Sequence, residues 1–167
     1  SSVESDNTQS VALGDVDGDG DLDLAVGNSG QPSRLYENNN GVLTASAVWS
    51  SSRIDETQSV AWGDVDGDGD LDLVCGSKTN HNIYWFENLD GQGTFDEGTL
   101  IELFGNQITI VQTLDMDNDT DLDVLAVHSS KNSISWYENL DNTDDFDSEK
   151  YLKVMTSSLT SLISSII

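Results

Sequence analysis

The sequence is poor in basic residues, with six Lys and Arg against 31 Asp and Glu, which gives a formal net charge of −25. Proteins that bind nucleic acids or anionic membranes present basic patches, so this balance argues against both kinds of partner. The excess of acidic residues favours cations as binding partners. A single proline and a hydrophobic content of 36% argue against a disordered chain.

Cysteine and long apolar runs are also scarce. Cys75 is the only cysteine, so no disulfide forms within the chain, and its apolar neighbours predict a small buried side chain. No apolar run approaches the ~18 residues of a membrane span, so we expect no membrane insertion in this segment. The first residues show neither the basic nor the apolar region of a signal peptide.

One segment occurs twice almost unchanged and once in a looser form. TQSVALGDVDGDGDLDLAVG (8–27) returns as TQSVAWGDVDGDGDLDLVCG (57–76), and TIVQTLDMDNDTDLDVLAV covers 109–127. Each copy is followed at a matching distance by LYEN, WFEN or WYEN, and then by turn residues. A repeat of about 50 residues sets the architecture, because each copy corresponds to one structural unit.

Each unit contains four short β-prone runs separated by Gly, Asn and Asp. In the first unit they cover roughly 9–14, 22–27, 33–38 and 43–49, and no stretch has a sustained helical period. Four short strands per unit are typical of a β-propeller blade. The predicted fold class is all-β, with three consecutive blades of four antiparallel strands. Because a ring typically needs four to eight blades, we expect a longer array.

The repeat also predicts the boundaries of the units. The predicted boundaries make 1–7 the tail of a preceding blade, 8–56, 57–107 and 108–158 the three blades, and 159–167 the lead-in to a further blade.

Aspartates occupy every second position of one loop in each unit. The loops cover 15–23, 64–72 and 115–123. Counted from the first aspartate, positions 1, 3, 5, 7 and 9 are Asp15, Asp17, Asp19, Asp21 and Asp23; Asp64, Asp66, Asp68, Asp70 and Asp72; and Asp115, Asp117, Asp119, Asp121 and Asp123. Carboxylates so close together repel one another unless a cation lies between them.

An oxygen-only set of ligands suits a hard cation, and six to eight oxygens in flexible geometry suit calcium better than magnesium. We therefore expect about one Ca²⁺ per loop, three in all. Side chains at positions 1, 3, 5 and 9 and the backbone carbonyl at position 7 would bind the ion. The side chains at position 7 would then point outward.

The spacing of the aspartates also fits two other interpretations. An EF-hand needs a bidentate Glu at position 12 and helices on both sides, but that position holds Val26, Cys75 or Ala126 and the flanks are strand-like. The alternative is a solvated acidic turn that binds nothing, which three regularly spaced copies make improbable.

The third loop departs from the other two. Asn118 and Thr120 replace two glycines, and Asn118 also begins the only N-x-S/T sequon. Position 6 of such a loop makes a sharp turn that needs a positive φ, so the β-branched Thr120 is expected to be strained. This loop should therefore fill last with calcium.

The segments SVALGDVDGDGDLDLAVG and SVAWGDVDGDGDLDLVCG closely resemble FG-GAP/VCBS-type repeats, the calcium-loop blades of integrin-α-like β-propellers. The resemblance implies that each calcium loop joins the first two strands of a blade. It also implies a secreted or cell-surface location and a role in adhesion, ligand binding or scaffolding. The implied partners are neighbouring blades or domains of the same longer protein, other extracellular proteins, or glycans.

Aromatic residues recur at one position of the units, where they either pack between blades or stack on a sugar. They are Tyr36, Tyr84, Trp85, Phe86, Trp136 and Tyr137. His81 and His128 have no evident partners and are expected at the surface. No nucleophile–base pair or P-loop is present, so we expect no enzymatic activity. A lectin-like propeller and an accessory propeller of a larger secreted enzyme remain alternatives.

Overall fold

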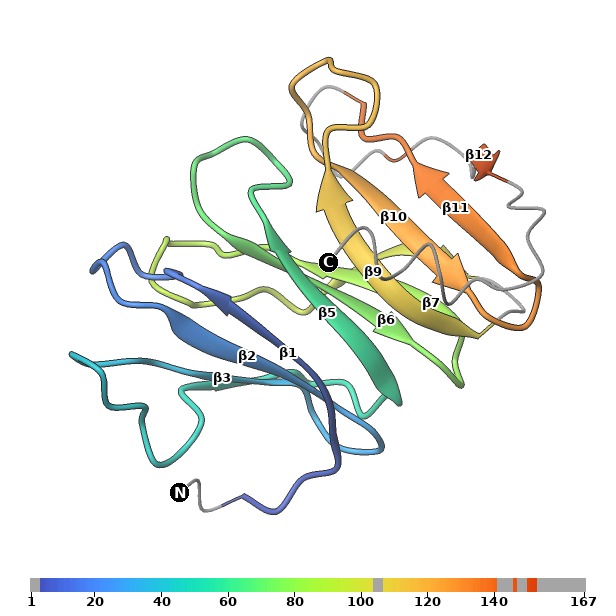
Figure 1. Cartoon of the computed structure of the whole chain (residues 1–167). Helices are drawn as coiled ribbons and strands as arrows, with labels where there is room; N and C mark the ends of the chain where they lie inside the picture. The colour runs from blue at the N-terminus through green and yellow to red at the C-terminus, as the bar shows by residue number, and fades with distance from the viewer. Residues whose placement is uncertain (1–3, 104–106, 141–145, 147–149, 153–167) are drawn as a thin grey trace.

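The computed structural model describes residues 4–103, 107–140, 146 and 150–152. These residues form three four-stranded antiparallel sheets that follow one another along the chain (Figure 1). The first sheet contains β1 (Thr8–Gly14), β2 (Asp23–Asn28), β3 (Arg34–Tyr36) and β4 (Trp49–Ser50). The second contains β5 (Thr57–Gly63), β6 (Asp72–Ser77), β7 (Asn82–Phe86) and β8 (Thr99–Leu103). The third contains β9 (Ile108–Leu114), β10 (Asp123–His128), β11 (Ser133–Tyr137) and β12 (Lys150–Leu152).

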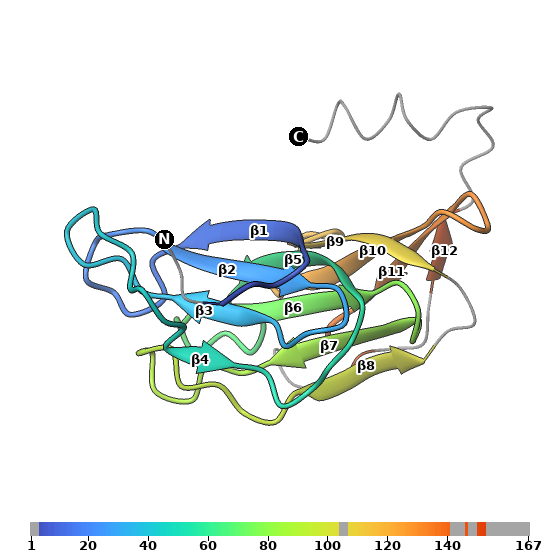
Figure 2. The ribbon, with the colours of Figure 1, turned by 90° about the horizontal axis from the view of Figure 1, so that it is seen from below.

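Within each sheet the strands lie in chain order, which confirms the predicted blades of four antiparallel strands. Figure 2 shows the first strands of the sheets along one side of the molecule, with β4 and β8 on the opposite side. The strand β5 contacts both β1 and β9. No helix among the described residues is long and apolar enough to cross a membrane.

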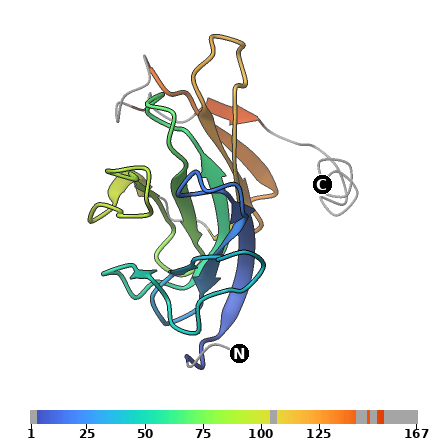
Figure 3. The same ribbon diagram turned by 90° about the vertical axis from the view of Figure 1, so that its left-hand side faces the viewer.

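The alternation of side chains along the strands gives each sheet two different faces. In the first sheet Ala12 stands opposite Ala25, and Ala25 stands opposite Leu35, so the three share one face. That face packs against the second sheet. In Figure 3 the ribbons of the first and second sheets lie side by side. The opposite face carries Val11 and Leu13, which are 59% and 60% exposed.

Two apolar clusters lie between neighbouring sheets. The cluster between the first and second sheets contains Val16, Ala25, Leu35, Val60, Leu73, Cys75, Tyr84, Phe86 and Phe95. The cluster between the second and third contains Val65, Val74, Ile83, Trp85, Ile108, Val111, Val124, Ala126 and Tyr137. The core is therefore the contact between blades, as in repeat proteins in which each unit is stabilised by its neighbours.

A glycine near the end of β2 and another near the end of β6 allow this close contact. A Cβ added at Gly76 would lie 2.6 Å from Val111 Cγ1 and 2.8 Å from Ile108 Cγ2 in the next blade. A Cβ at Gly27 would lie 2.7 Å from Thr57 Cγ2. The Val-Gly and Cys-Gly pairs of the repeat therefore leave room for the first strand of the following blade.

The fourth strand of the first sheet is shorter than the run 43–49 predicted from the sequence. Only Trp49–Ser50 pairs with β3, while Leu43 forms an isolated bridge with Asn38. Leu43 and Val48 of this run do not pack in the core, since they are 44% and 51% exposed. Trp49 does, because its ring contacts Phe86 and Phe95.

Residues 4–7 lie against the first sheet. Arg34 forms an ion pair with Asp6 at 2.5 Å, and the Tyr36 hydroxyl donates to Glu4 Oε2 at 3.2 Å. The backbone N–H of Ser29 donates to the Asn7 carbonyl at 2.9 Å. Residues 1–3 of the predicted preceding-blade tail, and the whole predicted lead-in 159–167, lie outside the described residues.

Candidate metal centres

The three aspartate loops connect the first and second strands of their sheets. Each begins directly after β1, β5 or β9 and ends at the aspartate that starts β2, β6 or β10. In Figure 1 the loops project from corresponding ends of the three sheets. The repeat therefore places one acidic loop at the same position of every blade.

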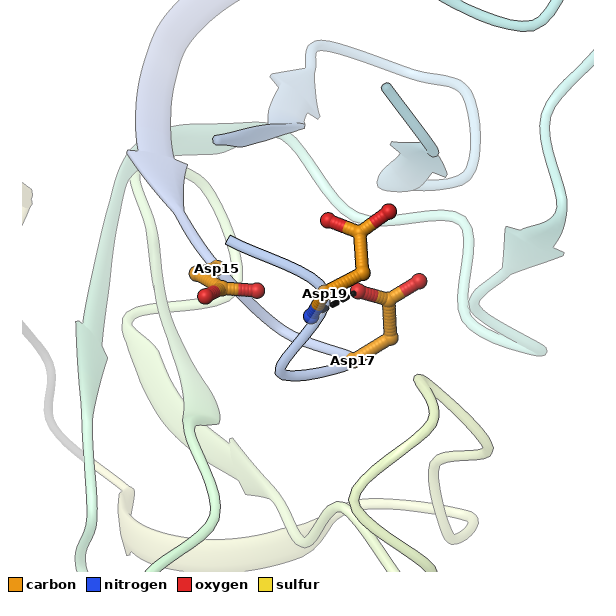
Figure 4. Close-up of side chains that lie close together, drawn as sticks. All are labelled: Asp15, Asp17 and Asp19. Carbon is orange, nitrogen blue, oxygen red and sulfur yellow. Dashed lines mark hydrogen bonds between the residues drawn. The ribbon is translucent and has the colours of Figure 1, made fainter. Parts of the chain in front are cut away.

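In the first loop the carboxylates at positions 1, 3 and 5 converge (Figure 4). One oxygen from each of Asp15, Asp17 and Asp19 lies within 4.8 Å of the others. Hydrogen bonds from the aspartates to the loop backbone hold the loop in its turn. Asp17 Oδ1 accepts from the Asp19 N–H at 3.1 Å, and Asp19 Oδ1 accepts from the Asp21 N–H at 2.8 Å. Such Asx turns fix a short acidic segment without a side-chain partner from elsewhere.

The second loop repeats this arrangement. Asp64, Asp66 and Asp68 each offer an oxygen within 4.8 Å of the others. Asp64 Oδ2 accepts from the Gly69 N–H at 3.1 Å, as Asp15 Oδ2 accepts from the Gly20 N–H at 3.0 Å in the first loop. The two loops therefore present the same cluster of carboxylates.

The remaining oxygen at position 1 is buried and has no hydrogen-bond donor in either loop. These atoms are Asp15 Oδ1 and Asp64 Oδ1. Among the described residues no Lys or Arg forms an ion pair with the carboxylates of either cluster. A buried, charged oxygen without a partner is costly.

A calcium ion fits this arrangement of oxygens. Calcium binds oxygen at about 2.3–2.6 Å, so two ligands on opposite sides of the ion stand about 4.6–5.2 Å apart. The carboxylate oxygens of each cluster lie within 4.8 Å of one another, which is compatible with that range. The residues at positions 1, 3 and 5 would hold the ion, and the ion would satisfy the orphan oxygen.

The aspartates at position 9 fasten the loop to the rest of the blade. Asp23, Asp72 and Asp123 are 0%, 1% and 0% exposed. Asp72 Oδ2 accepts from the Val65 N–H at 3.0 Å, and its Oδ1 accepts from the Asn88 N–H at 2.8 Å.

Burial raises the pKa of Asp72 to about 6, although these two hydrogen bonds oppose the shift. The pKa values of Asp23 and Asp123 are raised by burial in the same way. At all three position-9 carboxyls burial disfavours the ionised form, and the backbone hydrogen bonds favour it.

The sequence analysis expected the side chains at position 7 to point outward. In the structure they contact other parts of their blades. Asp21 Oδ2 accepts from the Asn40 N–H at 2.7 Å, and Asp121 is only 8% exposed. Asp70 lies so close to the turn after β7 that a Cβ added at Gly91 would stand 2.6 Å from its Oδ1. In the first two blades, position 7 is therefore in contact with the turn that follows the third strand.

The third loop has the expected backbone and a different set of contacts. Thr120 has a φ of 87° where Gly20 and Gly69 have 95° and 100°, which confirms the predicted positive φ at position 6. Asp115 Oδ1 accepts from the Asn118 N–H at 2.6 Å, so its oxygen is satisfied within the loop. Here the oxygens that converge belong to Asp115, Asp117 and Asp123.

Two asparagines that the sequence analysis did not select also touch the loops. They are Asn88 and Asn139, the last residues of the WFEN and WYEN motifs, and both are fully buried. Each donates from its side-chain amide to a loop carbonyl of the preceding blade, Val16 in one case and Val65 in the other. The signal in the sequence was the asparagine common to all three motifs.

The recurring aromatic residues are mostly buried. Tyr36, Tyr84, Trp85, Phe86 and Tyr137 are all less than 9% exposed, and Trp136 is partly buried. Four of them belong to the clusters between blades, which confirms the packing interpretation.

The sequence analysis also predicted whether His128 and Cys75 are exposed or buried. His128 is 1% exposed, so the expectation of a surface position is wrong for it. Burial raises the pKa of the Cys75 thiol to about 12, consistent with the expected small buried side chain.

Comparisons with known proteins give a family and solved structures that resemble this chain. A family model described as the FG-GAP-like repeat matches residues 15–75 and 64–126. A mutant form of the Tc holotoxin pore from Photorhabdus luminescens is 22% identical, with a TM-score of 0.49. The similarity covers 88% of this chain and 7% of that one. No curated protein sequence matches the chain.

Proposed function

Because the chain belongs to the FG-GAP-like repeat family, we propose that it is a non-catalytic β-propeller segment whose aspartate loops bind calcium for structural stability. The proposal expects about one ion per loop. It places the protein outside the cell or at the cell surface, where calcium modules that bind at roughly 10⁻⁴–10⁻³ M are filled. The role would be adhesion, ligand binding or scaffolding.

The observation that carries the proposal is the pair of orphan oxygens, Asp15 Oδ1 and Asp64 Oδ1. Each is buried beside two further carboxylates and has no donor, although buried polar atoms in folded proteins are nearly always paired. A divalent cation with oxygen ligands is the partner that such a cluster lacks. Calcium would supply the positive charge that removes the repulsion within the loop.

The structural effect follows from where the loops lie. A filled loop holds the end of one strand to the start of the next, so the free energy of binding adds to the free energy of folding. Positions 1, 3 and 5 would hold the ion in the first two loops. Position 9 orients the loop through its backbone hydrogen bonds.

Exposed apolar side chains and the buried recurring rings bear on the choice of partner. Val11, Leu13 and Leu22 expose apolar side chains on the first blade, which favours a neighbouring blade or domain of the same protein as a partner. The burial of Tyr84, Trp85 and other recurring rings removes the main support for sugar stacking. A glycan array with the intact protein would test the lectin alternative, which predicts specific binding.

Thermal unfolding of the intact protein tests the calcium proposal. Excess chelator should lower the midpoint markedly, and added calcium should restore it more fully than the same concentration of magnesium. Asp64→Asn removes one charge from the second loop and should reduce the gain from calcium. Glu97→Gln removes one charge from an exposed residue outside the loops and should leave that gain unchanged. A melting curve that chelator does not change would refute the proposal.

A further inference from the structure

We propose that calcium binding by successive loops is coupled through Asn88 and Asn139, because each side-chain amide hydrogen bonds to the loops of two neighbouring blades. The inference rests on the proposed function and adds to it that the sites do not fill independently. Asn88 and Asn139 act as positioning residues, since neither is expected to touch the ion.

Asn88 joins the first loop to the second. Its Nδ2 donates to the Val16 carbonyl at 3.1 Å, and Val16 lies between the aspartates at positions 1 and 3 of the first loop. The same Nδ2 donates to the Leu71 carbonyl at 3.4 Å, directly before Asp72 in the second loop. An amide carries two N–H groups, so one bond to each loop uses its full capacity.

The rest of the Asn88 residue is fixed as well. Its Oδ1 accepts from the Gly93 N–H at 3.1 Å, and its backbone N–H donates to Asp72 Oδ1 at 2.8 Å. The residue is 0% exposed, so water does not replace a bond that is lost. A displacement of either loop therefore leaves a buried polar group without its partner.

Asn139 repeats the connection one blade further on. Its Nδ2 donates to the Val65 carbonyl of the second loop at 2.7 Å and to the Leu122 carbonyl of the third at 3.2 Å. Its backbone N–H donates to Asp123 Oδ1 at 2.9 Å, and the residue is 0% exposed. The three loops are thus linked in series by two buried amides.

The turn that follows Asn88 makes a second contact with the first loop. Gln92 Nε2 donates to the Asp17 carbonyl at 2.9 Å. A Cβ added at Gly93 would lie 2.9 Å from Leu35 Cδ2 and 3.7 Å from Val16 Cγ1. The turn of one blade is therefore packed on the acidic loop of the blade before it.

These contacts predict positive coupling, in which each filled loop favours filling of its neighbour. Repulsion among the carboxylates of an empty loop would displace its backbone, and such a displacement would withdraw the Val16 carbonyl from Asn88. A filled first loop holds Asn88 in place, and Asn88 then holds the carbonyl beside Asp72 in the second loop. Filling one loop should therefore favour filling of the next, by about 2- to 10-fold in affinity, the range that one net hydrogen bond supports.

Asn38 provides a matched control within the chain. It occupies the same motif position in the first blade, where its Nδ2 donates to the Leu22 carbonyl at 3.0 Å and its backbone N–H to Asp23 Oδ1 at 2.8 Å. Within the described part of the chain, no acidic loop precedes its blade. A change at Asn38 therefore affects its own loop without breaking a connection between two loops.

The test follows each loop separately in the intact protein. The backbone amides of Gly20 and Gly69 each donate to the aspartate at position 1 of their own loop, so their resonances report calcium binding loop by loop. Asp15→Asn together with Asp17→Asn silences the first loop. Calcium affinity of the second loop, read at Gly69, should then fall by about 2- to 10-fold.

The same silencing is repeated in three further backgrounds. In Asn88→Asp, which keeps the acceptor for Gly93 but removes both donated bonds, silencing the first loop should no longer change the second. Asn88→Ala makes the same comparison without an added charge. In Asn38→Asp, which adds the same charge, silencing should still weaken the second loop.

Three results would overturn the inference. The first is an unchanged affinity at Gly69 when the first loop is silenced, and the second is coupling that persists in both Asn88 variants. The third is the absence of any calcium-dependent shift at Gly20 and Gly69, which would overturn the proposed function itself. The first two leave calcium binding intact and reject only the connection between loops.

Discussion

The substitution Thr120→Gly should strengthen the third calcium loop. Thr120 has a φ of 87° at a position where the other two loops have glycine. A β-branched residue with positive φ is strained in the closed loop by about 1–3 kcal/mol. Glycine removes the strain but loses more backbone entropy on folding, about 0.5–1 kcal/mol. The net gain for the calcium-loaded protein is therefore about 0–2.5 kcal/mol, and about 1 kcal/mol at the middle of both ranges.

The way this gain is observed depends on the state of the empty loop. If the loop opens without calcium, relief of strain raises the calcium affinity of the third loop by about 5-fold, and by at most about 70-fold. If the loop is closed without calcium, the same relief raises the free energy of unfolding in chelator. Calcium titration followed at the residue 120 amide, together with denaturant unfolding with and without calcium, measures both contributions.

The reverse substitution provides the matched control. Gly69 has a φ of 100°, and a Cβ added there would meet no atom within 4 Å, so Gly69→Thr introduces the backbone strain without a clash. It should weaken the second loop by a similar amount and leave the third unchanged. The strain argument fails if Thr120→Gly increases neither affinity nor stability, or if Gly69→Thr has no effect.

Three further predictions concern the packing around the loops. Asp72→Asn places an amide opposite two backbone N–H donors and should lower the free energy of unfolding in chelator by about 1–3 kcal/mol, as measured by urea titration. Leu35→Ala, at a site 1% exposed between two blades, should cost about 2–5 kcal/mol, whereas Val42→Ala at a site 69% exposed should stay within about 0.5 kcal/mol. Gly76→Ala should cost about 1–3 kcal/mol through overpacking against Val111 and Ile108, and a neutral result by denaturant unfolding would refute this account of the blade contact.

The repeat and the positions of the paired strands were predictable from the sequence. Alternating apolar residues and regular turn residues specify short strands, and a second copy 49 residues later sets the register of the blades. The prediction of a strand over the whole run 43–49 was wrong, because β-propensity does not tell whether a neighbouring strand is available for pairing. There, Leu43 and Val48 are exposed and only Trp49–Ser50 pairs.

The sequence predicted which residues form the acidic loops, but it did not predict most of their contacts with other segments. Spacing alone indicated the acidic loops and the positive φ of Thr120, because both depend on local geometry. The contact of Asp21 with Asn40, the burial of Asp121 and the bridging role of Asn88 depend on segments that meet only after folding. Residues 16 and 88 come from different blades, and no local pattern indicates that they touch.

A structure of the intact protein crystallised with millimolar calcium tests the central claim most directly. Anomalous scattering should place an ion next to Asp15 Oδ1 and another next to Asp64 Oδ1, the two buried oxygens without donors. Each ion should lie about 2.3–2.6 Å from its carboxylate ligands at positions 1, 3 and 5. Well-ordered loops with water or no density at those two positions would contradict the calcium account.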